Sequence, residues 1–146
     1  MKKLIYLLAL LPLFAFQCSS DDDNTVDDSV DIQEVAQQTQ NSDWVVTSFV
    51  DGNEDQTYHY IGFVFSFNEN GSLVATNGTD TYEGTWSVTS SSSSPDFNMN
   101  FSVGDDHPFD EFNDDWDIVS YSPTLIELYD VSGGNGDVHT LIFEAL

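Results

Sequence analysis

Hydrophobic and polar residues alternate with a period of two along most of the chain after position 44. Every second position is apolar in two long runs, which are Ile61, Phe63, Phe65 and Phe67, and then Phe97, Met99, Phe101 and Val103. This alternation is typical of β-strands that bury one face and expose the other. It predicts strands at 44–50, 60–67, 72–77, 80–89, 96–103, 115–121, 124–131 and 138–145.

Short polar segments separate these strands. Asn68–Gly71, Asn77–Gly78 and Gly133–Gly136 contain residues that favour hairpin turns, and a serine-rich loop covers 90–95. No helical crossover joins the strands, and only a helical turn or loop is expected at 106–114. The chain is therefore predicted to be all-β, an antiparallel up-and-down meander of about eight strands that closes into a small barrel.

A short helix is predicted ahead of the first strand, at 30–40. Ser29 is of a residue type that caps helix N-termini, and Glu34 lies near the first turn. The apolar residues available for burial are few, namely Ile32, Val35 and Ala36. Packing against the strands must therefore supply most of the stability of this helix.

The N-terminal segment has the features of an export signal. Lys2 and Lys3 precede an apolar stretch, Leu4 to Phe16, that is shorter than the roughly 20 residues needed to span a bilayer. Cys18, the only cysteine, follows directly and resembles the lipidated cysteine of bacterial lipoproteins. The resemblance implies a signal peptide at 1–17 and an acylated Cys18. The sequence departs from the usual pattern because Phe16 and Gln17, not small residues, precede the cysteine.

An acidic segment, 18–31, follows and is predicted to be a flexible tether. The run Cys18-Ser-Ser-Asp-Asp-Asp is similar to the export signal of flavobacterial lipoproteins. This similarity implies a lipid-anchored location in the outer membrane, facing the cell exterior. Asp28-Ser29-Val30 resembles the O-glycosylation pattern of Bacteroidota, which makes Ser29 a candidate glycosylation site.

Several motifs after position 41 resemble a family of flavobacterial surface lipoproteins with a lipocalin-like domain. They are Trp44-Val-Val-Thr-Ser-Phe-Val-Asp-Gly, Phe63-Val-Phe-Ser-Phe-Asn-Glu-Asn-Gly, Gly84-Thr-Trp-Ser-Val, Phe112-Asn-Asp-Asp-Trp-Asp-Ile-Val, Thr124-Leu-Ile-Glu-Leu and Leu141-Ile-Phe-Glu. The resemblance implies that 32–146 form one lipocalin-like β domain. It implies no activity, because a shared fold does not define a function.

The charge of the chain excludes several functions. There are 26 acidic residues and two basic ones, Lys2 and Lys3, so residues 18–146 contain no Lys or Arg. Nucleic-acid binding lacks the cations that neutralise phosphates, and anionic ligands lack the usual Arg or Lys partners. Repulsion between such chains favours a monomer.

Candidate chemistry is sparse, and the chain is predicted not to be an enzyme. The histidines are isolated, and no Gly-x-Ser-x-Gly nucleophile motif is present. Apart from calcium, no cofactor is expected. The candidate calcium ligands form two acidic groups, Asp51, Asn53 and Asp55, and Asp114, Asp115 and Asp117. The second group belongs to a larger acidic cluster at 105–117, which also contains Asp105, Asp106, Asp110 and Glu111. A solvated acidic surface without a specific metal site is the simpler explanation of both groups.

The aromatic residues leave two functional hypotheses open. The candidate ligand-binding residues are the inward-facing aromatics Trp44, Phe63, Phe65, Trp86, Phe101 and Trp116. If they line a cavity, the domain is a lipocalin-like binding module for a small apolar molecule or a neutral glycan. If they fill the barrel, the protein is a structural or interaction lipoprotein that docks to an outer-membrane partner. The volume inside the barrel discriminates between the two.

Overall fold

The computed structural model describes residues 31–90, 94–131 and 136–146. The chain begins there with helix α1 (Ile32–Gln40) and contains two short 3-10 helices, η1 (Thr57–His59) and η2 (Pro108–Phe112). The strands are β1 (Asp43–Asp51), β2 (Glu54–Asp55), β3 (Val64–Phe67), β4 (Ser72–Thr76), β5 (Thr81–Ser90), β6 (Pro95–Phe101), β7 (Asp115–Ser122), β8 (Leu125–Val131) and β9 (Val138–Ala145).

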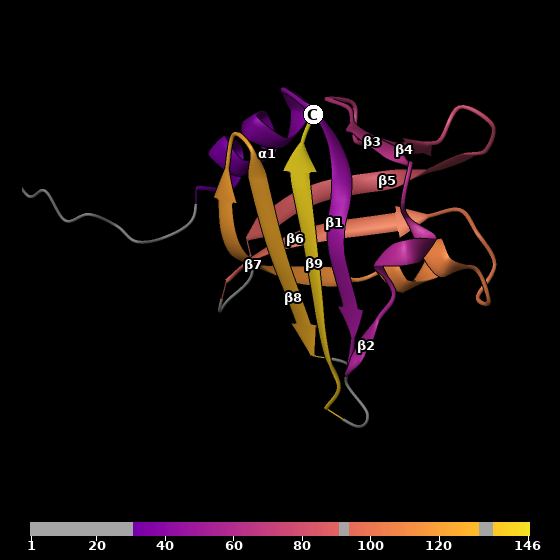
Figure 1. Ribbon diagram of the computed structural model, residues 1–146. Coiled ribbons are helices and arrows are strands. Elements are labelled where there is room, and N and C mark those ends of the chain that lie inside the picture. Colours follow the sequence, from indigo (N-terminus) through magenta and orange to yellow (C-terminus); the bar gives the residue numbers. More distant parts are fainter. Residues whose placement is uncertain (1–30, 91–93, 132–135) are drawn as a thin grey trace, which may run out of the picture.

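The strands form a closed antiparallel barrel (Figure 1). β1 pairs with β3, each later strand pairs with the next, and β9 returns to pair with β1 from Trp44↔Ala145 to Asp51↔His139. β2 is an extra two-residue strand on β1. The predicted eight-stranded up-and-down meander is thus confirmed, with β2 as an unpredicted addition.

One predicted strand begins later than its sequence pattern suggests. The run 60–67 becomes β3 only at Val64, because Tyr60 closes η1 and Gly62 turns the chain at φ +86°. Ile61, expected on the buried face, is 71% exposed. The alternation thus holds for Phe63, Phe65 and Phe67 but not for Ile61.

The predicted short helix is present and starts at Ile32. Asp31 is its N-cap: its carboxylate accepts hydrogen bonds from the backbone N–H groups of Gln33 (2.9 Å) and Glu34 (3.4 Å). The expected cap, Ser29, lies outside the described residues, as do Cys18 and the signal segment. Within the described ranges, no helix has the length and apolar character that a membrane crossing requires.

The inward faces of the strands form one aromatic-rich core. Its buried members include Trp44, Phe49, Phe65, Phe67, Leu73, Phe97, Phe101, Trp116, Ile126, Leu128, Leu141 and Phe143. Gly84 lets β5 and β6 approach closely, since a β-carbon there would lie 2.2 Å from the carbonyl oxygen of Asn100. A side chain at position 84 would therefore force these two strands apart.

The two ends of the barrel differ. Helix α1 packs at the end where β1 begins, and the indole N–H of Trp44 donates to the carbonyl oxygen of Thr39 (2.8 Å). The C-terminal Leu146 lies at the same end, because its N–H donates to the carbonyl oxygen of Asp43 (2.9 Å; Figure 1). Strands alternate in direction, so the β1–β3 and β6–β7 connections, with η1 and η2, lie at the opposite end.

Candidate functional site

The β6–β7 connection folds into the open end of the barrel. Pro108 occupies the first turn of η2, where its missing N–H costs nothing, and the His107 side chain caps the helix by accepting a hydrogen bond from the N–H of Phe109. Both phenylalanines of η2, Phe109 and Phe112, are buried. This short helix therefore carries two aromatic rings into the core.

These two rings pack against rings from the surrounding strands. Phe112 stacks on Tyr60, with ring centroids 4.3 Å apart, and meets Phe49 edge-on at 5.2 Å. Phe109 meets Phe101 edge-on at 5.0 Å. Such contacts fill the centre of the barrel at this end with aromatic side chains.

Polar contacts fix η2 in this position. The hydroxyl of Tyr60 donates to the carbonyl oxygen of Pro108 (2.6 Å), and the indole N–H of Trp116 donates to that of Phe112 (3.2 Å). The Asn113 side chain pairs with both backbone groups of Phe101, accepting from its N–H and donating to its carbonyl oxygen. The Asn113 side chain thus makes the two hydrogen bonds to the Phe101 backbone that a neighbouring strand would otherwise make, at the point where β6 and β7 separate.

The six candidate ligand-binding aromatics lie in this packed core. All of Trp44, Phe63, Phe65, Trp86, Phe101 and Trp116 are buried. Phe65, for example, has the rings of Phe101, Phe109 and Phe143 within 6.3 Å of its own centroid. The structure therefore brings these residues together as packing partners.

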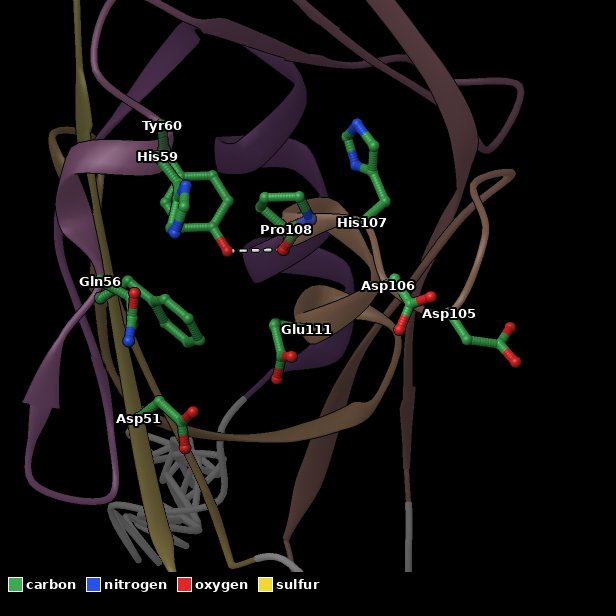
Figure 2. Close-up of a pocket in the computed structure, with 10 residues that line it drawn as sticks. Asp51, Gln56, His59, Tyr60, Asp105, Asp106, His107, Pro108 and Glu111 are labelled. Carbon is green, nitrogen blue, oxygen red and sulfur yellow. Dashed lines mark hydrogen bonds between the residues drawn. The ribbon is translucent and has the colours of Figure 1, made fainter.

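A polar recess of about 390 Å³ lies outside the core, between η1 and η2 (Figure 2). Its lining comes from the end of β1, from the η1 segment and from the β6–β7 connection, and consists of Phe49, Asp51, Gln56, His59, Tyr60, Asp105, Asp106, His107, Pro108 and Glu111. The buried rings of Phe49 and Tyr60 form its floor. In Figure 2, Glu111 lies between Asp51 on one side and Asp106 and Asp105 on the other.

The electrostatic character of the recess is negative. Burial raises the pKa of the Tyr60 hydroxyl above its ordinary value, and the nearby carboxylates of Glu111 and Asp51 act in the same direction. The hydroxyl therefore stays protonated and keeps its hydrogen bond to Pro108. Within the described residues, Asp105, Asp106 and Glu111 have no hydrogen-bond or ion-pair partner for their carboxylates.

Asp51 differs from the other acidic residues of the recess because it has a partner. Its carboxylate lies 2.9 Å from Nε2 of His139, on the neighbouring strand β9. Nδ1 of the same histidine is 3.9 Å from Asp130 on β8, and the buried Oδ2 of Asp130 accepts no hydrogen bond in the described part of the chain. Asp51, His139 and Asp130 thus form a row of polar side chains across β1, β9 and β8. This row lies two residues along the strands from the paired apolar residues Phe49 and Leu141.

The first predicted calcium group is divided by the strand geometry. β1 and β2 pair so that Asp55 lies opposite Val50, whereas Asp51 lies opposite Glu54. Asp51 lines the recess, but the carboxylate of Asp55 accepts a hydrogen bond from the N–H of Thr57 (2.9 Å), and contacts with Thr57 lower its pKa. These two carboxylates therefore have separate surroundings.

The second predicted calcium group lies along the start of β7. Asp115 and Asp117 are exposed on either side of the buried Trp116. Partial burial raises the pKa of Asp114, and the charges of Asp130 and Asp115 add to this effect. Across the described ranges, no three His, Cys, Asp or Glu side chains are grouped closely enough to hold a metal ion.

Sequence reasoning named the acidic residues of the recess but did not bring them together or identify its aromatic residues. Gln56 and His59 lie between two predicted strands, and Tyr60 was expected to begin the second of them. Asp105, Asp106 and Glu111 belong to the acidic cluster at 105–117, but the sequence did not show that they meet Asp51 around one recess. One local signal was available, because Pro108 is of a residue type that is typical of the first turn of a helix. Nothing local indicates that η1 and η2 meet.

Comparisons with known proteins give little further information. No family model matches the chain, and no curated protein matches it. Among solved structures, a crystal structure of a DUF4847 family protein from Bacteroides vulgatus matches with 14% identity and a TM-score of 0.49. The match covers 75% of this chain and 96% of that protein. A likeness of this size assigns neither a family nor a function.

Proposed function

We propose that the protein is a non-enzymatic interaction module, anchored to the outer membrane by lipid on Cys18 and facing the cell exterior. In this proposal, the filled barrel is a rigid scaffold that docks to an outer-membrane partner through its outside. This proposed function does not require the binding of calcium. The proposal follows the second of the two hypotheses that the sequence left open.

The filled core carries this proposal. Phe109 and Phe112 occupy the position that an internal ligand would need, and both are held by neighbouring rings and by the polar contacts of η2. A lipocalin-like site for a small apolar molecule or a neutral glycan would require η2 to leave the barrel. Removing both rings from their packing would cost several kcal/mol, at about 3–5 kcal/mol for each phenylalanine.

The arrangement of the two ends supports presentation of the recess to a partner. The described chain starts at α1, at one end of the barrel, and the recess lies at the opposite end. A lipid on Cys18 would therefore attach the domain through its α1 end, by way of the predicted flexible tether 18–31. The recess, at the end away from the attachment point, would stay accessible to a partner.

Site-specific photo-crosslinking in native cells tests this proposal. A photoreactive amino acid would replace exposed Tyr58, beside the recess, or exposed Asn100, on the outer face of β6. We expect a discrete adduct with an outer-membrane protein from position 58 and none from position 100. The proposal is wrong if position 58 gives no adduct and native mass spectrometry instead finds one small apolar molecule or glycan retained per chain.

A further inference from the structure

We propose that the recess between η1 and η2 receives a Lys or Arg side chain from a basic segment of the partner protein, with an apolar neighbour of that side chain resting on Tyr58 and Ile61. This inference rests on the proposed function and deepens it. It names the surface that docks and the chemistry of the partner.

Charge complementarity is the first argument. The carboxylates of Asp105, Asp106 and Glu111 line the recess and have no ion-pair partner in the described parts of the chain. No internal Lys or Arg can neutralise them, because residues 4–146 contain neither. A cation for this recess must therefore come from another molecule.

The apolar edge of the recess is the second, independent argument. Tyr58 is 62% exposed although its ring lies 4.0 Å from that of His59, which lines the recess. Ile61, on the same segment, is 71% exposed. Two large exposed side chains on the short segment that also supplies His59 and Tyr60 to the recess form an apolar surface that a protein partner could cover.

The combination favours a protein partner over a free cation. A metal ion would need grouped ligands, and the described residues provide no group of three acidic, His or Cys side chains around one point. A small amine could satisfy the carboxylates but would leave Tyr58 and Ile61 exposed. A peptide segment with a basic residue next to an apolar one would cover both features at once.

Titration of the purified full-length chain with labelled peptides tests the inference. The probes are a set of capped hexapeptides, each with one Lys or Arg flanked by Leu or Phe, followed by fluorescence anisotropy in a neutral detergent. We expect saturable binding of at least one peptide, which Gln in place of its basic residue abolishes. Binding should weaken as NaCl increases, because the carboxylates of the recess are accessible to screening ions.

Two variants locate the site, and a third is the matched control. Glu111→Gln removes a recess charge, and Tyr58→Ala removes the apolar edge; each is expected to weaken binding about tenfold. Glu69→Gln makes the same change of charge in the β3–β4 hairpin, at the α1 end of the barrel, and should change binding by less than about twofold. Circular dichroism of each variant checks that it is folded.

Several outcomes would overturn the inference. Equal losses in Glu111→Gln and Glu69→Gln would show general attraction of cations to an acidic protein. Displacement of the peptide by equimolar methylamine, or by calcium, would show a small-cation site. No binding by any peptide would also refute it. If crosslinking from position 58 nevertheless identifies a partner, and that adduct survives Glu111→Gln, the proposed function stands and the basic-segment inference falls.

Discussion

Replacing Phe112 by alanine tests directly whether η2 fills the barrel. Phe112 is 0% exposed, and its ring lies within 6.4 Å of the ring centroids of Phe49, Tyr60, Phe65, Phe101, Phe109 and Phe143. Burial of an aromatic side chain removes about 150–250 Å² from water, which at about 25 cal/mol per Å² is about 4–6 kcal/mol. Alanine retains part of that burial, so we expect a loss of about 3–5 kcal/mol in the free energy of unfolding.

Urea unfolding followed by tryptophan fluorescence measures this loss. Trp44, Trp86 and Trp116 are buried in the core and report on its exposure to water. The matched control is Asn100→Ala, at an exposed position of β6 with its side chain on the outer face. If Phe112→Ala loses less than about 1 kcal/mol, like a typical surface substitution, η2 does not fill the barrel. An interior ligand site would then have to be reconsidered.

Four further predictions follow from the same structure. Phe65→Ala and Phe101→Ala should each lower the free energy of unfolding by about 3–5 kcal/mol in the same urea assay. Asn98→Ala and Asn100→Ala should each lower it by less than about 1 kcal/mol. Equal losses on the two faces of the strands would contradict the assigned alternation. Cys18→Ser should release the protein from the membrane fraction or block its processing, and a processed mutant that remains membrane-bound on fractionation would disprove lipidation. The melting temperature should rise from about 0.01 M to about 1 M NaCl, because salt screens the repulsion between carboxylates. Calcium should raise the melting temperature no more than NaCl of equal ionic strength. A saturable extra rise that EDTA removes would indicate a specific calcium site. Folding raises the pKa of Asp114, so the stability that its protonated form contributes is fully present below the unfolded pKa of about 3.9 and is lost as pH rises through the folded pKa. Asp114→Asn should therefore reduce the gain in the free energy of unfolding between pH 7 and pH 4, measured by urea unfolding. An unchanged gain would contradict this assignment.

The fold could be predicted because alternation and turn residues are local signals. Phe63, Phe65 and Phe67 identify one buried face, and the turn residues around Gly71 show where the strand reverses. Hairpin-length connections then leave a meander as the simplest topology. Ile61 was assigned wrongly because the pattern of apolar residues extends back into the turn at 60–62, between η1 and β3, where the backbone does not alternate.

The candidate site could not be predicted, because it depends on contacts between distant segments. Alternation shows that Phe65 and Phe101 point inward, but it does not show whether another side chain fills the space between them. Phe109 fills that space from a loop, and Tyr60 holds the loop through a hydrogen bond across 48 positions of sequence. Likewise, the spacing of Asp51 and Asp55 suggested shared ligands, whereas the pairing of β1 with β2 separates them.

The pairing of β1 with β9 has a consequence for how the protein is made. Synthesis proceeds from the N-terminus, so β1 emerges first and must wait for β9, whose pairing extends from Trp44↔Ala145 to Asp51↔His139. Until then, β1 and β8 each present an unpaired edge that can join with other chains. Contacts between such distant strands also form slowly. A ribosome that stalls within the last strand would therefore release a product with two exposed edges, and we expect cellular proteases to remove it.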